Sequence, residues 1–534
     1  MYSNKTHINI LTSMLGAYGI KHIVVCPGSR NAPLLHNLHQ AAEELEFSLH
    51  PVTDERSAGF VAIGIAAHTQ ECVAICVTSG SAVLCCKPAI AEAYYRQLPI
   101  LVLSADRPKE WINHLDGQTI FQEQALLPYA MCYDIEDSET CINETTLQLH
   151  QALNTLIQNS LPVQINVQIQ EPLFKFNVYK LPEISPIIKV QQEANKSYLP
   201  KEITSLLQEA KRPMLIMGHS DEFIPEVFPK IAQHIACLPE IISNAPDSIY
   251  STQVEKILRV YKHWDYQPDV VVHLGGAFVH KELKLFLRTL KDVKVIRIDS
   301  HFHDADTFRH LIHSVKLSTK EALWALANLP FNKTAHEEMI FSINNAIPKN
   351  NHLKNFEQLV IESLGNILNT GLYHIGALHL ANSLSVRLAS QFIQGGKFPI
   401  YCNRGTNGIE GSLSAAVGTA LCSPNIVLAV IGDLSFFYDV NALWNESLRG
   451  NLRILLLNNQ GGRIFSSLKG LNESPALPQY VSAQHQATAY GVSLSFNCHH
   501  KAVNDINEIE AALQWLFNTD FNRPAILEIQ SRID

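Results

Sequence analysis

The stretch from 431 to 468, IGDLSFFYDVNALWNESLRGNLRILLLNNQGGRIFSSL, constrains the fold of this chain more than any other. An apolar run, NIVLAVI, ends in GDLS at 432–435, and a second run, RILLL, ends in NNQGG at 458–462. Each run has the length and apolar character of a buried parallel strand, and the amphipathic segment FFYDVNALWNESL between them predicts the crossover helix. Open α/β sheets bind ligands beyond the carboxyl ends of their strands. The stretch therefore predicts a binding site containing a carboxylate, a carboxamide and two glycines.

These residue types suit a hard cation that holds a diphosphate. Asp433 and Asn459 offer oxygen ligands, a backbone carbonyl near Gly461 can complete the set, and glycines let a phosphate approach the backbone. Gly432 and Asn459 are separated by 459 − 432 = 27 residues, which is about one βαβ unit. A generic βα turn followed by an ordinary Asn-Gly loop is the alternative. The presence of both the Gly432-Asp433 pair and the Asn458-Asn459 pair at this spacing favours the cofactor site over that alternative.

The composition excludes several classes of partner. The 534 residues predict roughly three domains. The net charge of −9 without a long basic run argues against nucleic acid as a partner. No apolar segment reaches the roughly 18 residues that a membrane span needs, and the first 20 residues predict an amphipathic helix rather than a signal peptide. We therefore expect no integral membrane contact.

Cysteine usage predicts a reducing, cytoplasmic location. The chain has 11 cysteines, an odd number without a Cys-x-x-Cys pair, and several lie within apolar runs. The tripeptide Cys498-His499-His500 suggests zinc at first sight, but no second ligand pair stands at finger spacing. We interpret it as the end of a surface strand or loop.

Alternating helix and strand patterns predict an α/β fold with three parallel-sheet domains. We place them at 1–180, 198–330 and 355–534, with proline-punctuated or irregular linkers at about 181–200 and 328–355. In the central domain, Gly275-Gly276 lacks the rest of a GxGxxG pattern, so we interpret that domain as mainly structural. In the last domain, ALHLANSLSVRLASQF predicts an amphipathic helix with Ser383 and Arg387 on one face.

Polar residues follow several predicted strands of the first domain. Singly, each is explained by a helix cap, a first-turn carboxylate or an ion pair. Together, on one sheet edge, they suggest a site. The loops carry Ser29 and Arg30 in CPGSR, Glu55 in DER, TSGS at 78–81, and Arg107 in ADRP followed by Gln118.

The assembled motifs resemble the thiamine diphosphate (ThDP)-dependent 2-succinyl-5-enolpyruvyl-6-hydroxy-3-cyclohexene-1-carboxylate synthases of menaquinone (vitamin K2) biosynthesis. Other ThDP enzymes share only the glutamate and the GD…NN pair. The resemblance covers both outer domains and, weakly, the central one. The motifs that carry it, in order, are CPGSRNAPL, DERSAGFVAIGIA, TSGSAV, LSADRP with Gln118, NSLSVRL, NRGTNGIEGSLSAAVG, GDLSFFYD and NNQGGRIF.

The resemblance implies a ThDP site of the kind that spans two domains. Glu55 matches the catalytic carboxylate that hydrogen-bonds the aminopyrimidine of the cofactor, and Ile409 matches the apolar wedge that bends it. Asp433, Asn459 and the carbonyl of Gly461 match the ligands of Mg²⁺ or Mn²⁺. The other positions implied in cofactor binding are Gly432, Leu434, Ser435, Gly462 and Ile464.

The implied reaction is a C–C bond-forming transfer. 2-Oxoglutarate is decarboxylated, and its succinyl-semialdehyde unit adds to isochorismate. Both substrates are polycarboxylates, and arginine binds carboxylates in a bidentate manner. Ile464, Phe465 and Leu468 match the apolar wall of the family's site, although any helix start needs core residues too. The implied substrate contacts are Ser29, Arg30, Arg107, Gln118, Lys281, Ser383, Arg387, Arg404, Phe465 and Leu468.

Two positions depart from the family pattern. Glu282 follows Lys281 where the family has an arginine, which removes a cation next to an implied substrate contact. Asn31 replaces the usual serine or threonine after Ser-Arg, which is a milder change.

The resemblance also implies a homodimer or homotetramer, since the glutamate and the diphosphate loop of one site belong to different chains. One alternative is another ThDP-dependent 2-oxo acid decarboxylase or carboligase, similar to acetolactate synthase. The four candidate arginines favour dianionic substrates over pyruvate. A catalytically silent binding or scaffold protein is a further alternative, against which stand the intact Glu55, Asp433 and Asn459.

Overall fold

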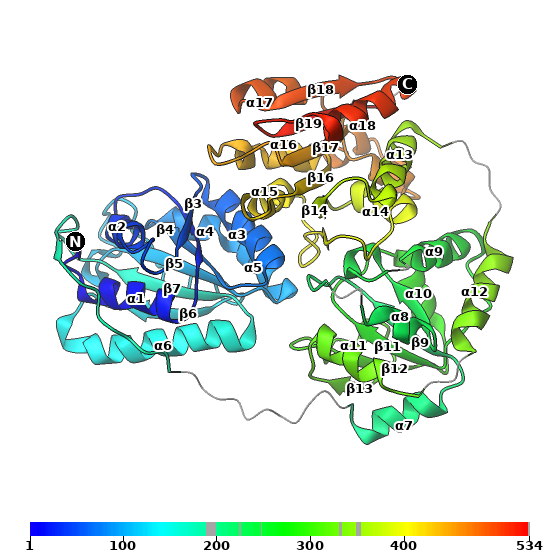
Figure 1. The fold of residues 1–534 in the computed structure, drawn as a ribbon, viewed down its shortest axis with the longest axis horizontal. Coiled ribbons are helices and arrows are strands. Elements are labelled where there is room, and N and C mark those ends of the chain that lie inside the picture. The colour runs from blue at the N-terminus through cyan, green and yellow to red at the C-terminus, as the bar shows by residue number, and fades with distance from the viewer. Residues whose placement is uncertain (188–198, 224–225, 247, 331–333, 349–353, 532–534) are drawn as a thin grey trace.

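Three parallel sheets succeed one another along the chain, as the sequence predicts (Figure 1). The structure is a computed structural model that describes residues 1–187, 199–223, 226–246, 248–330, 334–348 and 354–531. The first and last sheets have six strands each and the central one has five. The middle of the first predicted linker, 188–198, lies outside the described residues.

The N-terminal sheet has the strand order β3-β2-β4-β5-β7-β6. Its strands are β2 (His22–Val25), β3 (Ser48–Pro51), β4 (Val73–Val77), β5 (Ile100–Asp106), β6 (Met131–Ile135) and β7 (Val163–Gln168). A short antiparallel pair joins β1 (Tyr2–Ser3) to β8 (Phe176–Val178). The helices are α1 (Thr6–Ala17), α2 (Ala32–Gln40), α3 (Glu55–Thr69), α4 (Ser81–Cys85), α5 (Lys87–Arg96) and α6 (Ile142–Asn159). Apolar residues of β4 and β5 point alternately into two cores, because helices cover both faces of the sheet.

The C-terminal sheet repeats this connectivity, with the strand order β15-β14-β16-β17-β19-β18. Its strands are β14 (Ile375–Leu380), β15 (Ile400–Tyr401), β16 (Ile426–Gly432), β17 (Leu452–Asn458), β18 (His499–Val503) and β19 (Ala525–Gln530). The helices are α13 (Phe356–Thr370), α14 (Leu384–Phe392), α15 (Ser412–Cys422), α16 (Asp433–Tyr438), α17 (Ala489–Ser495) and α18 (Ile509–Asn518). The predicted strands NIVLAVI and RILLL are the adjacent parallel β16 and β17.

The central sheet has the order β10-β9-β11-β12-β13. Its strands are β9 (Pro213–Met217), β10 (Ala236–Pro239), β11 (Val270–Leu274), β12 (Lys294–Ile298) and β13 (Leu311–Val315). Its helices are α7 (Lys201–Glu209), α8 (Phe228–Ala232), α9 (Ile249–Tyr261), α10 (Lys281–Thr289), α11 (Thr319–Ala327) and α12 (Ala335–Ala346).

Three local predictions were wrong. The crossover after β16 is not one helix: α16 ends where buried Asp439 accepts hydrogen bonds from Ser414, and a 3-10 turn (η4, Val440–Leu443) follows. The segment ALHLANSLSVRLASQF is the end of β14 followed by α14, so Ser383 precedes the helix. The second predicted linker contains α12, whose apolar residues pack on the central core.

The two outer domains share one apolar core, which residues of α3, α5, α15 and β16 form together. Helices α3 and α15 lie in direct backbone contact at two glycines. A Cβ on Gly64 would fall 1.9 Å from the carbonyl oxygen of Ala415, and one on Gly418 would fall 2.1 Å from that of Val61. Only glycine permits this close approach. The packing fixes the N-terminal domain against the C-terminal domain within one chain.

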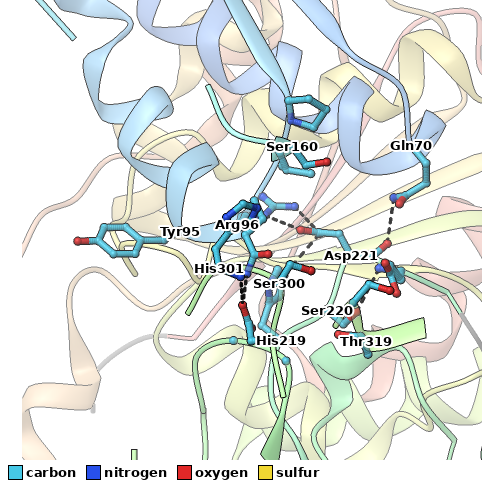
Figure 2. A pocket seen from close by; sticks show the side chains of 18 of the residues that line it. Gln70, Tyr95, Arg96, Ser160, His219, Ser220, Asp221, Ser300, His301 and Thr319 are labelled. Atoms are coloured by element: carbon cyan, nitrogen blue, oxygen red, sulfur yellow. Dashed lines mark hydrogen bonds and ion pairs between the residues drawn. The ribbon is translucent and has the colours of Figure 1, made fainter. Parts of the chain in front are cut away.

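A buried arginine joins all three domains. Arg96, at the end of α5, contacts both carboxylate oxygens of Asp221 in the central domain, at 3.0 and 2.5 Å (Figure 2). The same guanidinium donates to Asn403 of the C-terminal domain at 2.9 Å. The side chains of Arg96 and Asp221 are only 1% and 7% exposed. Burial alone would raise the pKa of Asp221, but the charge and hydrogen bonds of Arg96, together with the charge of His219, outweigh it and hold the pKa below its ordinary value.

The ion pair borders an interdomain cavity of about 290 Å³, which is shown in Figure 2. The loops after β9 and β11 line it, including Gly275-Gly276, and residues of α3 and α5 close it. None of the predicted site residues lines this cavity. Within the described part of the chain, no helix has both the length and the apolarity for a membrane crossing.

We predict that Arg96→Met lowers the free energy of unfolding by about 3–5 kcal/mol, because Asp221 then stays buried without its counter-charge. Urea unfolding followed by fluorescence would show the lower midpoint. Arg212→Met is the matched control, since Arg212 pairs with Glu338 at a site where both side chains are nearly half exposed. Equal midpoints for the two variants would contradict the role assigned to Arg96.

Candidate active site

A cavity of about 440 Å³ opens at the carboxyl edge of the C-terminal sheet. It lies beyond β15, β14, β16 and β17, where the strand order reverses, which is the usual ligand position in an open α/β sheet. The structure thus brings together 13 residues that the sequence predicts for one site. They are Ser383, Arg387, Arg404, Ile409, Gly432, Asp433, Leu434, Ser435, Asn459, Gly461, Gly462, Ile464 and Phe465.

Asp433 is the buried carboxylate of this cavity. It begins α16, and one of its oxygens accepts a hydrogen bond from Gly461 N at 2.8 Å. His485 Nε2 lies 3.3 Å from the same oxygen. Burial raises the pKa of Asp433 above its ordinary value, although the backbone N–H groups of Gly461 and Leu434 oppose the rise. A carboxylate that is costly to keep ionised in this way is stabilised by a bound cation.

Asn459 presents a free oxygen beside this carboxylate. Its Nδ2 donates to Glu357 Oε1 at 2.7 Å, and Glu357 is itself buried at the start of α13. The opposite atom, Oδ1, is buried and has no hydrogen-bond partner. Glu357 therefore fixes the orientation of the carboxamide, and the oxygen is left for a ligand. Oxygen donors of this kind fit Mg²⁺ or Mn²⁺.

The loop after β17 turns at two glycines that line the cavity, Gly461 and Gly462. Gly461 has φ +145° and packs so closely that a Cβ would fall 2.7 Å from the carbonyl oxygen of Ser482. Gly462 N donates to that same oxygen at 2.7 Å. The residues present therefore fit a metal-held diphosphate.

Two arginines give the cavity positive charge. Arg404 donates to Asn382 Oδ1 at 3.1 Å and to the carbonyl of Phe278 at 2.7 Å. Arg387 donates to the carbonyl of Ser383 at 2.6 Å. Burial, and then the charge of Arg404, lowers the pKa of Arg387. Both guanidiniums are oriented by neutral acceptors, so their charge remains available to an anionic ligand.

Apolar side chains complete one wall. Ile409 is 41% exposed, although it lines the cavity, and its carbonyl accepts from Ser435 Oγ. Phe465 and Ile464 line the cavity on the other side, at the start of the 3-10 helix η5 (Arg463–Ser467). Leu468, which the sequence places in the same wall, is 44% exposed and does not line the cavity.

The remaining predicted residues lie elsewhere, most of them on the N-terminal sheet. Loops after β2 and β4 touch there, since a Cβ on Gly28 would collide with Thr78. Glu55 is the first residue of α3, and Asp54 caps that helix by accepting from the backbone N–H of Arg56. Ser29, Arg30, Glu55, Arg107 and Gln118 do not line the cavity of the same chain.

Arg30 is held more firmly than its sequence motif indicates. It is 1% exposed, and its guanidinium donates to the carbonyl of Ile169 and to Glu171 Oε1 at 2.8 and 3.0 Å. The guanidiniums of Arg30 and Arg107 lie 5.6 and 5.9 Å from the ring centre of Trp111. The Nε atoms of both arginines are buried and have no hydrogen-bond partner.

The two departures have structural explanations. Glu282 pairs with Lys262 at 3.0 Å, so its charge is partly compensated, and Lys281 is exposed at the start of α10 rather than in the cavity. Asn31 is buried and donates to the carbonyl of Cys26 at 2.9 Å, which lets it serve the loop structurally.

Sequence reasoning missed Glu357, His485 and Trp111. Glu357 lies 102 residues from Asn459 along the chain, and a glutamate in a first helical turn is ordinarily a solvent-exposed residue. His485 is one of 24 histidines and stands in no motif. Only the fold brings Glu357 and His485 to the site, whereas Trp111 follows Arg107 by 111 − 107 = 4 residues in the chain.

Comparison with known proteins agrees with this geometry. Residues 6–126 match the family model described as "Thiamine pyrophosphate enzyme, N-terminal TPP binding domain", and residues 385–529 match "Thiamine pyrophosphate enzyme, C-terminal TPP binding domain". The benzoylformate decarboxylase structure from Polynucleobacter necessarius superposes with a TM-score of 0.75 at 14% identity, covering 98% of each chain, which shows a shared fold.

Relatives that match over nearly their whole length identify the family within the ThDP enzymes. The 2-succinyl-5-enolpyruvyl-6-hydroxy-3-cyclohexene-1-carboxylate synthase of Phocaeicola vulgatus is 35% identical over 99% of this chain and 96% of its own. That of Bacteroides fragilis has the same identity and coverage, and that of Desulfotalea psychrophila is 32% identical over 98% of both chains. The site just described therefore lies in a ThDP enzyme, and the chain belongs to the 2-succinyl-5-enolpyruvyl-6-hydroxy-3-cyclohexene-1-carboxylate synthase family.

Proposed function

We propose that this chain catalyses the reaction for which its family is named, within menaquinone biosynthesis. 2-Oxoglutarate loses CO₂, and the remaining succinyl-semialdehyde unit joins isochorismate by 1,4-addition. The observation that carries the proposal is the joint presence of two guanidiniums, Arg387 and Arg404, and the oxygens of Asp433 and Asn459 in one cavity. A cofactor diphosphate and a polycarboxylate substrate both find partners there.

Asp433, Asn459 and the Gly461 carbonyl are the proposed ligands of Mg²⁺ or Mn²⁺, which holds the ThDP diphosphate. ThDP, when bound, supplies the electron sink that makes decarboxylation of a 2-oxo acid feasible. Arg387 and Arg404 would bind substrate carboxylates, and Ile464 and Phe465 would exclude water from the reacting carbon. The odd number of cysteines, 11, supports a reducing cytoplasm as the place of action.

We further propose that two chains complete each site. The cavity is lined by residues between Asn382 and Phe465, and Glu55 is not among them. Glu55 must reach the cofactor ring for the site to work, so a second copy is the natural source. Ser29, Arg30, Arg107 and Gln118 lie on the same sheet edge as Glu55 and would come from that copy with it. Lys281 remains a proposed contact from the central domain.

Substrate choice tests the function directly. With ThDP and Mg²⁺ supplied, we expect consumption of 2-oxoglutarate that depends on isochorismate, and little turnover of pyruvate, because the arginines need a distal carboxylate to bind. CO₂ release and product mass would be measured. Preferred turnover of pyruvate would favour an acetolactate synthase-like carboligase, and ThDP binding without any turnover would indicate a silent relative.

Mixing two inactive variants tests the shared site. Glu55→Gln should abolish turnover while ThDP still binds, and Asp433→Asn should weaken metal and cofactor binding. If each site is formed by two chains, subunit exchange in an equal mixture makes about half of the dimers heterodimers. One of the two sites in each heterodimer has both intact residues, so about a quarter of all sites are intact. Activity should recover to that level. No recovery after verified exchange would place both residues of a site in one chain.

Removal of Glu357 tests the orientation of Asn459. Glu357→Ala should weaken Mg²⁺ binding by about 10- to 100-fold, as is typical when a partner of a metal ligand is lost. A Mg²⁺ titration of ThDP binding by calorimetry would measure it. Glu357→Gln keeps an acceptor for Asn459 Nδ2 and should restore most of the affinity. The control is Glu362→Ala on the same helix, where Glu362 pairs with Lys354 at the surface, and an equal effect there would refute the role.

A further inference from the structure

A group of nitrogen and sulfur ligands lies between the two outer domains. His22 begins β2, and His50 lies on the neighbouring β3. The parallel register pairs His22 with Ser48 and Val24 with His50, so the two histidines are diagonal neighbours on one face of the sheet. His22 Nδ1 and His50 Nε2 are 3.1 Å apart.

The third member comes from the other domain. Cys422 is the last residue of α15, and its Sγ lies 3.9 Å from His22 Nδ1. The three ligand atoms all lie within 4.8 Å of one another. Across the described residues, this is the group of histidine, cysteine and acidic side chains whose spacing would hold a metal ion.

Two of the three separations between ligand atoms are close to those of a tetrahedral zinc site. Zn–N bonds of about 2.0–2.1 Å and a Zn–S bond of about 2.3 Å place two nitrogens about 3.3 Å apart, and a nitrogen and a sulfur about 3.6 Å apart. The observed distances of 3.1 and 3.9 Å differ from these values by a few tenths of an ångström. Zinc also prefers imidazole and thiolate ligands to water or carboxylate alone.

The surroundings suit metal ligands in two respects. Burial lowers the pKa of His22, and it lowers that of His50 to about 4, so both imidazoles are neutral at pH 7, as binding requires. The second ring nitrogen of His22 lies 3.7 Å from Glu71 Oε2. A carboxylate behind a ligating histidine is the usual outer partner in zinc sites.

We propose that His22, His50 and Cys422 bind one Zn²⁺, with water as the fourth ligand, and that the ion joins the N-terminal domain to the C-terminal domain. The three residues are partly buried, so solvent reaches the open position. Burial, followed by the charge of Glu71, raises the pKa of the Cys422 thiol to about 11. Zinc binding therefore displaces the thiol proton into solvent, and the affinity should fall as the pH is lowered.

Cobalt substitution tests the site in the full-length protein. The chain is treated with a chelator, supplied with excess Mg²⁺ and ThDP to fill the oxygen-lined cavity, and titrated with Co²⁺. We expect one Co²⁺ per chain, with the near-ultraviolet charge-transfer band of a cobalt–thiolate bond and the visible bands of tetrahedral cobalt. Zn²⁺ should displace it and raise the unfolding temperature. A wild-type protein without the thiolate band overturns the proposal.

Matched variants identify the thiol. Cys422→Ser should abolish the band and the thermal shift, and His50→Gln should weaken Co²⁺ binding by at least about tenfold. The control is Cys498→Ser: Cys498 is also partly buried, its thiol pKa is also raised to about 11, and two histidines follow it. His499 and His500 are occupied by Asn522 and Glu528. A cobalt–thiolate band that survives Cys422→Ser, or that disappears in Cys498→Ser, overturns the assignment. If Cys422→Ser does not fold, unchanged Co²⁺ binding in His50→Gln overturns it instead.

Discussion

The contact between α3 and α15 is the constraint on which the rest of the structure depends. Helix α3 begins at Glu55, and α15 follows the loop that carries Arg404 and Ile409. Because Gly64 and Gly418 have no side chains, the two backbones meet directly, and the apolar core is continuous from one domain to the other. Two half-sites with identical strand order are thereby held in one fixed relation, which a flexible linker could not provide.

The buried pair of Arg96 and Asp221 adds specificity to this apolar contact. Apolar packing is largely non-directional, whereas a guanidinium that contacts two other domains tolerates few arrangements. The central domain contributes Asp221 here and the Phe278 carbonyl at the cavity, so it takes part in the site although none of its residues lines the cavity. The interpretation of this domain as mainly structural stays a prediction.

The parts of the site that the sequence predicts are local in the chain. Asp433 and Asn459 each follow an apolar strand, and strand ends of one parallel sheet meet at one edge, so their proximity follows from the pattern alone. Glu357 and His485 could not be found in this way, because tertiary folding brings them to Asn459 and Asp433 from distant segments. The same holds for Asp439, which ends α16 and accepts a hydrogen bond from Ser414 Oγ that no propensity encodes.

The arginines of the cavity are held by carbonyl and carboxamide oxygens rather than by carboxylates. Dipoles of this kind orient a guanidinium without cancelling its charge, so Arg387 and Arg404 repel each other. A bound anion would reduce that repulsion. Arg404 donates a hydrogen bond to the Phe278 carbonyl of the central domain. A ligand that binds Arg404 should therefore also stabilise the contact between the central and C-terminal domains. Anion binding in the cavity and a more rigid contact between the domains would then have the same electrostatic cause.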